Sequence, residues 1–144
     1  MTTRLLATIA AALEVTAGSA LIANPSFVIH LLIGASLSSG AIAVGRVGGF
    51  GLLCLGLACW PSGKVVTEQA TVALFIFNLF SALYIGDLGV YGGFIGYLLW
   101  PACVLRALLA ILLALPAYEA VRREWLGVQV QRSQRNSQRD RFRA

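Results

Sequence analysis

Four long hydrophobic segments follow one another along the chain, and each ends at residues that favour a turn. They cover about residues 5–23, 41–60, 68–85 and 91–115. The segments end at Asn24-Pro25, Trp60-Pro61, Gly86-Asp87 and Pro116. Because a transmembrane helix needs about 20 mostly apolar residues, each segment is long enough to span a bilayer. The pattern predicts an all-α fold, an integral membrane four-helix bundle that occupies residues 1–116.

A shorter apolar segment separates the first two spans. Residues 26–33 are apolar apart from Ser26 and His30, and small or polar residues follow them as far as Gly40, with Leu37 as the one exception. An apolar stretch of this length does not cross a bilayer. We therefore expect a short re-entrant or interface-lying segment within residues 26–37, directly after the first helix.

The composition supports the membrane assignment and excludes other classes of protein. Of the 144 residues, 58% are hydrophobic and 12% are charged, whereas soluble domains are about 45–50% apolar and about 25% charged. A soluble domain of this length could not bury so much apolar surface. Water-soluble enzymes, disordered regulators and nucleic-acid-binding modules are therefore disfavoured, and we expect the lipid bilayer as the first partner.

The distribution of basic residues predicts the topology. Seven of the 11 Lys and Arg residues follow Pro116, and Lys64 lies between the second and third spans. The two remaining loops, residues 24–40 and 86–90, contain neither Lys nor Arg. By the positive-inside rule, both termini and the Lys64 loop are cytoplasmic. This is the topology of a multi-pass membrane protein with cytoplasmic N- and C-termini.

The region after Pro116 is expected to lie at the cytoplasmic surface. Residues 117–126 predict an interfacial helix that ends at Gly127, and residues 127–144 predict a disordered basic tail. Arg122, Arg123 and Trp125 are candidates for contact with anionic lipids or with a partner protein. Nucleic acid is a disfavoured partner, because no fold is present to display the basic tail.

Two opposite charges fall at one depth within the predicted bundle. Glu14 lies nine residues after Leu5, and Arg106 lies nine residues before Leu115. At 1.5 Å per residue each is about 14 Å from the cytoplasmic end of its helix. Charges at such depths are normally paired or face a cavity. We therefore predict a buried Glu14–Arg106 pair, which either holds the first and fourth helices in register or provides a carboxylate for proton or substrate binding.

Two more polar residues complete the candidate intramembrane site. Arg46 lies near the outer end of the second span, where it can extend to the lipid headgroups or pair with Asp87. Asn78 lies midway along the third span and can hydrogen-bond across the bundle. Pro101 is expected to kink the fourth span and expose a backbone carbonyl near residue 97.

Small residues predict where helices pack closely. Glycines spaced four apart permit close helix contact in lipid, and they occur at Gly45, Gly49, Gly89, Gly92, Gly93 and Gly96. Cys54, Cys59 and Cys103 stand alone in apolar runs, which favours packing over metal binding or disulfide formation. No phosphate-binding loop, catalytic triad or metal-ligand cluster is recognisable, so neither a cofactor nor an enzymatic activity is expected.

Several motifs resemble a widespread group of small, uncharacterised bacterial inner-membrane proteins. The resemblance is carried by Glu14–Leu21, Pro25, Leu31–Gly34, Arg46–Trp60, Asn78–Tyr84 and Gly96–Ala102. It covers roughly residues 5–115 and leaves out the basic tail. At the level of the fold, the group is similar to the DoxX-like four-helix architecture. The resemblance implies a bacterial four-helix membrane bundle without a settled activity, and it places Glu14 and Arg46 in matching motifs.

The sequence is compatible with three functions. The first is a non-enzymatic accessory or assembly subunit of a membrane complex, which binds a membrane-protein partner or further copies of itself through its glycine faces. The second is a small oligomeric transporter or channel that uses Glu14 and Arg106. The third, by analogy only, is a redox- or quinone-linked membrane component.

Overall fold

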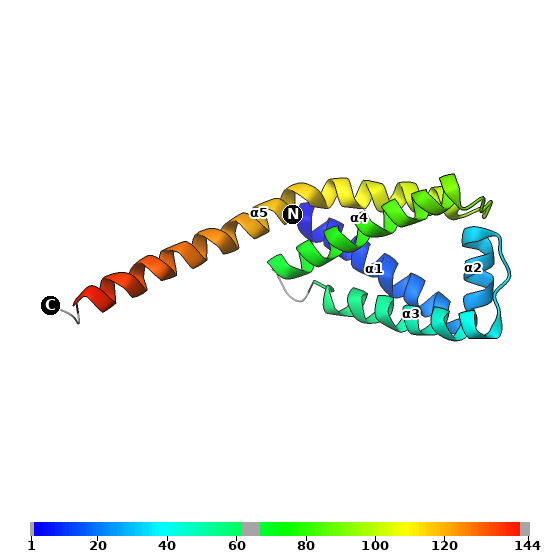
Figure 1. Ribbon diagram of the computed structural model, residues 1–144, viewed down its shortest axis with the longest axis horizontal. Helices are drawn as coiled ribbons and strands as arrows, with labels where there is room; N and C mark the ends of the chain where they lie inside the picture. The colour runs from blue at the N-terminus through cyan, green and yellow to red at the C-terminus, as the bar shows by residue number, and fades with distance from the viewer. Residues whose placement is uncertain (1, 62–66, 142–144) are drawn as a thin grey trace.

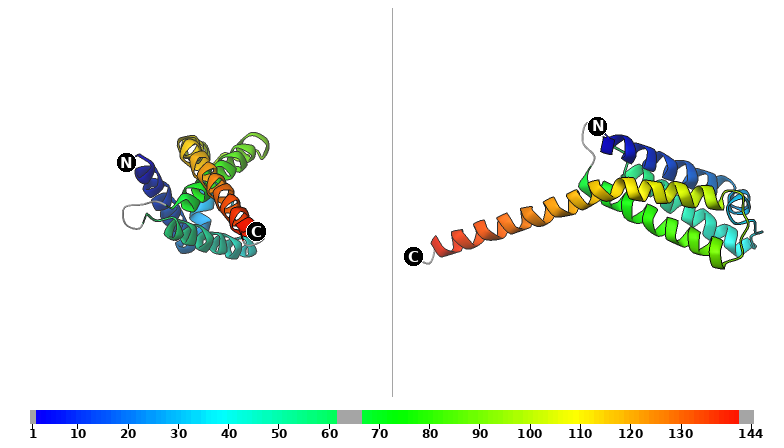
Figure 2. Two further views of the ribbon diagram at one scale, coloured as in Figure 1. Left: turned by 90° about the vertical axis from the view of Figure 1, so that its left-hand side faces the viewer. Right: turned by 90° about the horizontal axis from the view of Figure 1, so that it is seen from above.

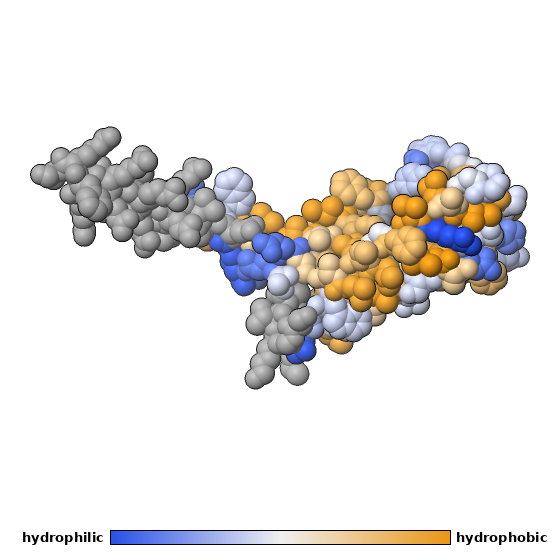
Figure 3. All heavy atoms as spheres, turned by 90° about the horizontal axis from the view of Figure 1, so that it is seen from below, coloured by the Kyte–Doolittle hydropathy of each residue, from blue (hydrophilic) through white to orange (hydrophobic). Residues whose placement is uncertain are grey.

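The computed structural model describes residues 2–61 and 67–141, and within them all regular secondary structure is helical. The helices are α1 (Thr2–Ala23), α2 (Pro25–Ile33), α3 (Ser39–Ala58), α4 (Glu68–Tyr91) and α5 (Leu99–Arg141). All except α2 contain a stretch long and apolar enough to cross a membrane. The predicted four-helix membrane bundle is therefore confirmed, and the chain is a multi-pass membrane protein. Hydrophobic residues cover most of the face of the bundle that Figure 3 shows.

The bundle consists of two antiparallel helix pairs. α1 packs chiefly on α3, and α4 packs chiefly on α5. Fewer contacts join the pairs, and they are made mainly by α1, which touches both α4 and α5. Figures 1 and 2 show the four helices running back and forth along one axis, with α2 lying across one end. α3 therefore lies at the outside of the bundle.

The short segment after α1 is a helix, and local signals define both its ends. Oδ1 of Asn24 accepts a hydrogen bond from the amide of Phe27 at 3.1 Å, and Pro25 occupies the first turn. Gly34 ends α2 in the left-handed conformation, with φ of 74°, which a residue with a side chain rarely adopts. Because α2 lies across the end of the bundle (Figure 1), its orientation is that of the interface-lying alternative.

The loop between α4 and α5 packs against α2. The amide of Leu98 donates to the carbonyl of Leu31 at 2.9 Å. A Cβ atom on Gly96 would lie 2.1 Å from the carbonyl oxygen of Leu32, so the two backbones are in contact there. The predicted loop at residues 86–90 is wrong, because α4 continues to Tyr91 and turns at Gly92 and Gly93, where Gly93 has φ of 65°.

Both prolines of the last helix behave differently from the prediction. α5 begins at Leu99 and not at residue 91, so Pro101 lies in the first turn, where the amide it lacks has no helical partner. The predicted kink at Pro101 is therefore wrong. Pro116 lies inside α5 and does not end it. Its ring clashes with the preceding turn and bends a helix, and α5 changes direction in its golden part, which holds Pro116 (Figure 1).

α5 also corrects the prediction for the end of the chain. Residues 117–126 belong to the same helix as the span, and the helix continues through Gly127 to Arg141. The prediction of a helix end at Gly127 and of an irregular chain beyond it is therefore wrong as far as Arg141. One glycine costs a helix only about 1 kcal/mol, and the Gln and Arg residues that follow are good helix formers. Residues 142–144 lie outside the described part of the chain.

Candidate functional site

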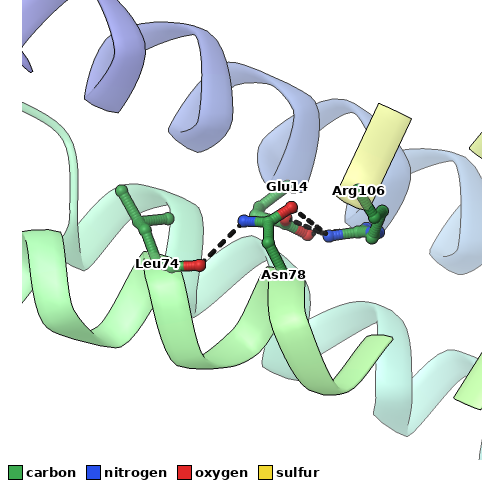
Figure 4. A network of polar contacts seen from close by, with 4 residues as sticks. All are labelled: Glu14, Leu74, Asn78 and Arg106. Atoms are coloured by element: carbon green, nitrogen blue, oxygen red, sulfur yellow. Dashed lines mark hydrogen bonds and ion pairs between the residues drawn. The ribbon is translucent and has the colours of Figure 1, made fainter. Parts of the chain in front are cut away.

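The buried polar residues of the bundle come from three helices. Glu14 lies on α1, Asn78 on α4 and Arg106 on α5, and Figure 4 shows their side chains pointing toward one another. Glu14 and Asn78 have no exposed surface. Small neighbours on α1, such as Ala10 and Ala11, are also buried, which lets the helices approach Glu14 closely. The structure thus brings together the two charges that share a predicted depth.

Arg106 holds both oxygens of the Glu14 carboxylate. Its Nη1 donates to Oε1 and its Nη2 donates to Oε2, the latter at 3.1 Å. Nη1 also donates to Oδ1 of Asn78 at 3.3 Å. Such a two-pronged contact between a guanidinium and a carboxylate is among the strongest polar contacts in proteins. Its strength compensates for part of the cost of removing both charges from water.

Asn78 links the ion pair to the backbone of its own helix. Its Nδ2 donates to the carbonyl of Leu74 at 2.8 Å, one turn earlier on α4. The orientation of the amide follows from chemistry, because a guanidinium offers only donors and a carbonyl only accepts. Asn78 therefore has one hydrogen left on Nδ2, and α4 positions one edge of Arg106.

An aromatic ring that the sequence analysis missed completes the surroundings of Arg106. The ring centre of Phe77, on α4, lies 4.9 Å from Cζ of the guanidinium, within the range of a cation–π interaction. Phe77 precedes Asn78 in sequence, and its type alone did not distinguish it from other apolar residues of the span. Only the packing of α4 on α5 brings the ring to the arginine.

A small pocket borders this network. It has a volume of about 160 Å³ and lies between α1, α4 and α5. Its walls include Asn78 and Arg106 together with apolar side chains such as Ala17 and Ala102. The side chain of Arg106 is 16% exposed, whereas that of Glu14 is fully buried. Arg106 is therefore the accessible member of the ion pair.

Arg46 lies apart from this network, on the surface of α3. It is exposed, and none of the ion pairs in the described part of the chain includes it. The same holds for Asp87, which is exposed on α4. The suggested Arg46–Asp87 pair is therefore not formed within the chain. Figure 3 shows a strongly hydrophilic patch surrounded by hydrophobic residues at the end of the bundle away from the tail.

The three candidate contact residues of the last helix have different surroundings. Arg123 lies 3.6 Å from Glu68 at the start of α4 and 3.3 Å from Glu119 on its own helix. Arg122 and Trp125 are exposed. Arg123 therefore contributes to the packing of α5 on α4, whereas Arg122 and Trp125 face outward.

Glycines allow α1 and α3 to approach closely, and the four-residue spacing predicted only some of them. A Cβ atom on Gly18 would lie 2.6 Å from the amide nitrogen of Leu53, and one on Gly56 would lie 2.7 Å from the carbonyl oxygen of Ala11. Gly49 belongs to the same contact between α1 and α3. Gly18 and Gly56 were missed, although small residues seven apart (Ala11 and Gly18, Gly49 and Gly56) are a readable signal.

The other predicted glycines have other surroundings. Gly45 approaches Pro25 at the start of α2, and Gly89 approaches Leu99 at the start of α5. Gly92, Gly93 and Gly96 belong to the turn between α4 and α5 and not to a helix–helix contact. The overlapping pairs predicted at the start of the fourth span therefore form a loop.

The cysteines are dispersed among the helices. Cys59 is buried in the apolar cluster at the α3 end, Cys54 is exposed, and the thiol of Cys103 lies 3.4 Å from the carbonyl oxygen of Ala82. Within residues 2–61 and 67–141, no three His, Cys, Asp or Glu side chains are grouped in a way that could hold a metal ion.

Comparison of the chain with family models, with curated proteins and with solved structures finds no match. The resemblance to DoxX-like proteins therefore stays a prediction, and the function has to be argued from the site itself.

Proposed function

We propose that this protein is a non-enzymatic accessory or assembly subunit, which binds another membrane protein through the outer face of α3. The observation that carries the proposal is the exposed Arg46. It lies seven residues after Ser39, about 10 Å along the helix from its outer end. A charge at such a depth costs free energy in lipid unless it reaches headgroups or a partner. A carboxylate or backbone carbonyl of a neighbouring subunit would relieve this cost.

The shape of α3 supports a protein neighbour. Cβ atoms on Gly48 and Gly51 would meet nothing within 4 Å, so these glycines face open space. Glycine costs a helix stability relative to alanine, and small residues allow a second helix to approach closely in lipid. α3 packs on α1 and α2 within the chain, which leaves this face free for a helix of another subunit.

Together with the resemblance to small bacterial inner-membrane proteins, the positions of the charges support an inner-membrane location with cytoplasmic termini. The start of α1, the end of α3, the start of α4 and the projecting part of α5 lie at one end of the bundle (Figure 1). Arg4 on α1 and Arg122 and Arg123 on α5 belong to that end, and Lys64 follows α3 in sequence, whereas residues 24–38 and 92–98 at the other end contain no Lys or Arg. By the positive-inside rule, the basic end with both termini is cytoplasmic.

The projecting part of α5 suits a second contact. From Arg123 to Arg141 the helix extends about 27 Å beyond the span. Residues 131–141 are polar throughout in sequence, and a polar helix that lies outside a bundle gains little from packing. Anionic headgroups or an acidic protein surface would stabilise it, because its sequence contains Arg132, Arg135, Arg139 and Arg141.

The transport and redox alternatives have less support. A transport pathway through Glu14 requires access to its carboxylate, but Glu14 is fully buried and Arg106 occupies both its oxygens. The ion pair joins α1 to α5 and, through Asn78, to α4, so its geometry favours a clamp between the two helix pairs. No observation favours redox chemistry.

Photo-crosslinking from α3 tests the proposal. A photoreactive residue replaces Val44 or Val47 on α3, or Ile111 on α5 as the control, because these side chains are 72%, 68% and 69% exposed. We expect protein adducts in native membranes from the α3 positions and mainly lipid adducts from Ile111. Mass spectrometry distinguishes a second copy from a different protein.

The Arg46→Ala variant is the matched test of the charge. The adducts from Val47 should fall at least several-fold in this variant, while the stability of the purified chain stays the same. Equal protein adducts from α3 and α5, or adducts that do not respond to Arg46→Ala, would contradict the proposal.

A further inference from the structure

Arg106 has donors that the buried network does not use. A guanidinium carries five N–H donors and no acceptor. Three hydrogen bonds are formed, two from Nη1 and one from Nη2. Nε and the second hydrogen of Nη2 make no hydrogen bond within the described residues. Because no buried polar side-chain atom lacks a partner there, the unpaired Nε is an accessible atom.

The accessible space beside Arg106 is the 160 Å³ pocket. Nη1 and Nη2 hold Glu14, and Phe77 lies against the guanidinium. The pocket borders Arg106 and Asn78, but only Arg106 has exposed surface, because Asn78 is fully buried. The polar part of the pocket wall therefore offers donors and no free acceptor.

The rest of the wall is apolar, and the pocket opens to the outside of the bundle. Leu13 and Ala17 contribute from α1, and Ala102 and Leu105 contribute from α5. Leu105 is 42% exposed on the surface of a membrane-spanning helix. A ligand would therefore enter from the hydrocarbon region of the bilayer and would itself have to be largely apolar.

Charge balance restricts the ligand further. The Glu14–Arg106 pair is neutral as a whole, so an anion would bring an uncompensated charge into an apolar site, at a high cost. A neutral ligand with a hydrogen-bond acceptor avoids that cost. The volume sets the size, because an apolar cavity of about 150 Å³ holds one benzene molecule.

We infer that this pocket is a binding site for a neutral, lipid-soluble compound with a single ring and a carbonyl acceptor. The ring lies between Ala17 and Ala102, and the carbonyl oxygen accepts from Arg106. Glu14 serves as a positioning residue, because it holds the guanidinium with its free donors toward the pocket. This site is independent of the α3 face, so either inference can fail without the other.

Two probes of nearly the same shape test the inference. Acetophenone carries a carbonyl on its ring, and ethylbenzene replaces that carbonyl with a methylene group. Each is titrated into the purified full-length chain in detergent micelles, and the ¹H–¹⁵N signal of Arg106 Nε, assigned with Arg106→Lys, is followed by NMR. We expect a saturable shift with acetophenone and an affinity about tenfold or more above that of ethylbenzene, from one hydrogen bond to a charged donor.

Variants of the pocket wall provide the controls. Ala102→Leu on α5 and Ala17→Leu on α1 fill the pocket from opposite sides and leave the ion pair in place, so both should abolish the saturable shift. Ala107→Leu is the matched control, because Ala107 lines a separate apolar groove between α4 and α5. Its binding of acetophenone should equal that of the unmodified chain.

The outcomes separate clearly. Equal affinity for the two probes would show that the carbonyl is not recognised, and a shift that persists in both filled variants would place binding elsewhere. Either result, or the lack of any saturable shift, overturns the inference. Loss of the shift in Ala107→Leu as well would do the same, because it would trace the effect to general instability.

Discussion

Two arginines within the membrane-spanning helices have opposite surroundings. Arg106 lies among α1, α4 and α5, where Glu14, Asn78 and Phe77 surround it. Arg46 is exposed on α3 without an ion pair in the described part of the chain. The bilayer penalises both charges. Side chains of the same chain compensate the charge of Arg106, whereas the charge of Arg46 has to be compensated by lipid headgroups or by another protein. The difference distinguishes the interior of the bundle, where the polar groups are paired, from the surface of α3, where a partner protein could bind.

Charge reversal at the two arginines should give the largest difference. Arg106→Glu places two carboxylates against each other in the interior, and leaving a buried charge without its partner costs about 3–5 kcal/mol. We expect a large loss of expression and of thermal stability in detergent. Arg46→Glu should change the stability of the isolated chain little, because no partner within the chain is lost. The double variant Glu14→Arg with Arg106→Glu should recover part of the loss. No recovery would mean that surrounding groups, and not the pair, determine the cost.

Glycines at the inner contact of α3 and on its open face should differ next. Gly18→Ala on α1, at the contact with α3, brings a methyl group against the backbone of Leu53 and should destabilise by about 1–3 kcal/mol. Gly51→Ala faces open space and should stabilise the purified chain by about 0.5–1 kcal/mol. Thermal unfolding in one detergent compares the two variants. Destabilisation by Gly51→Ala in the purified chain would show that this face is already occupied by a second copy.

Removal of the amide from the buried network should have a smaller effect. Asn78→Leu keeps the size of the side chain but loses the hydrogen bonds to Arg106 and Leu74. Hydrogen bonds between membrane helices contribute about 0.6 kcal/mol on average and up to about 1.7 kcal/mol, and we expect a loss in this range in unfolding measurements. A loss as large as that of Arg106→Glu would mean that Asn78, and not Glu14, is the main partner of the arginine.

The exposed ion pair between α4 and α5 should matter least. Glu68→Gln removes the partner of Arg123 on α4 and leaves Glu119 on α5 in place; the Glu68 and Arg123 side chains are 44% and 68% exposed. Exposed ion pairs contribute at most about 1 kcal/mol and are weakened by salt. We expect a change in stability below that value, which disappears at high ionic strength. A larger effect would indicate that this contact fixes the position of α5.

Much of the fold could be read from the sequence, because hydrophobic length has few alternatives in a membrane. The four spans and the presence of a short segment after α1 follow from local patterns. The ends of α4 and α5 did not follow. Gly86 and Gly89 resemble a turn in sequence, but the helix continues to the adjacent glycines Gly92 and Gly93. Pro101 and Pro116 look alike in sequence, although only the actual start of α5 at Leu99 decides which of them interrupts the helix.

In the candidate site, only the contacts that depend on depth along a helix could be predicted from the sequence. The register of Glu14 and Arg106 follows from counting residues along antiparallel helices. The contributions of Asn78 and Phe77 depend on the rotation of α4 about its axis, and counting does not determine this rotation. The same limit applies to Gly18 and Gly56, whose role depends on which face α1 presents to α3.

The sequence by itself determined that this chain crosses a membrane several times, and it determined which few polar residues lie within the spans. This follows because apolar length and charge position act on each helix separately. Only the tertiary structure decided that Arg106 is enclosed while Arg46 is exposed, and that a small pocket beside Arg106 carries unused donors. These features depend on how helices rotate and pair, and that is set by side-chain packing between segments far apart in the chain.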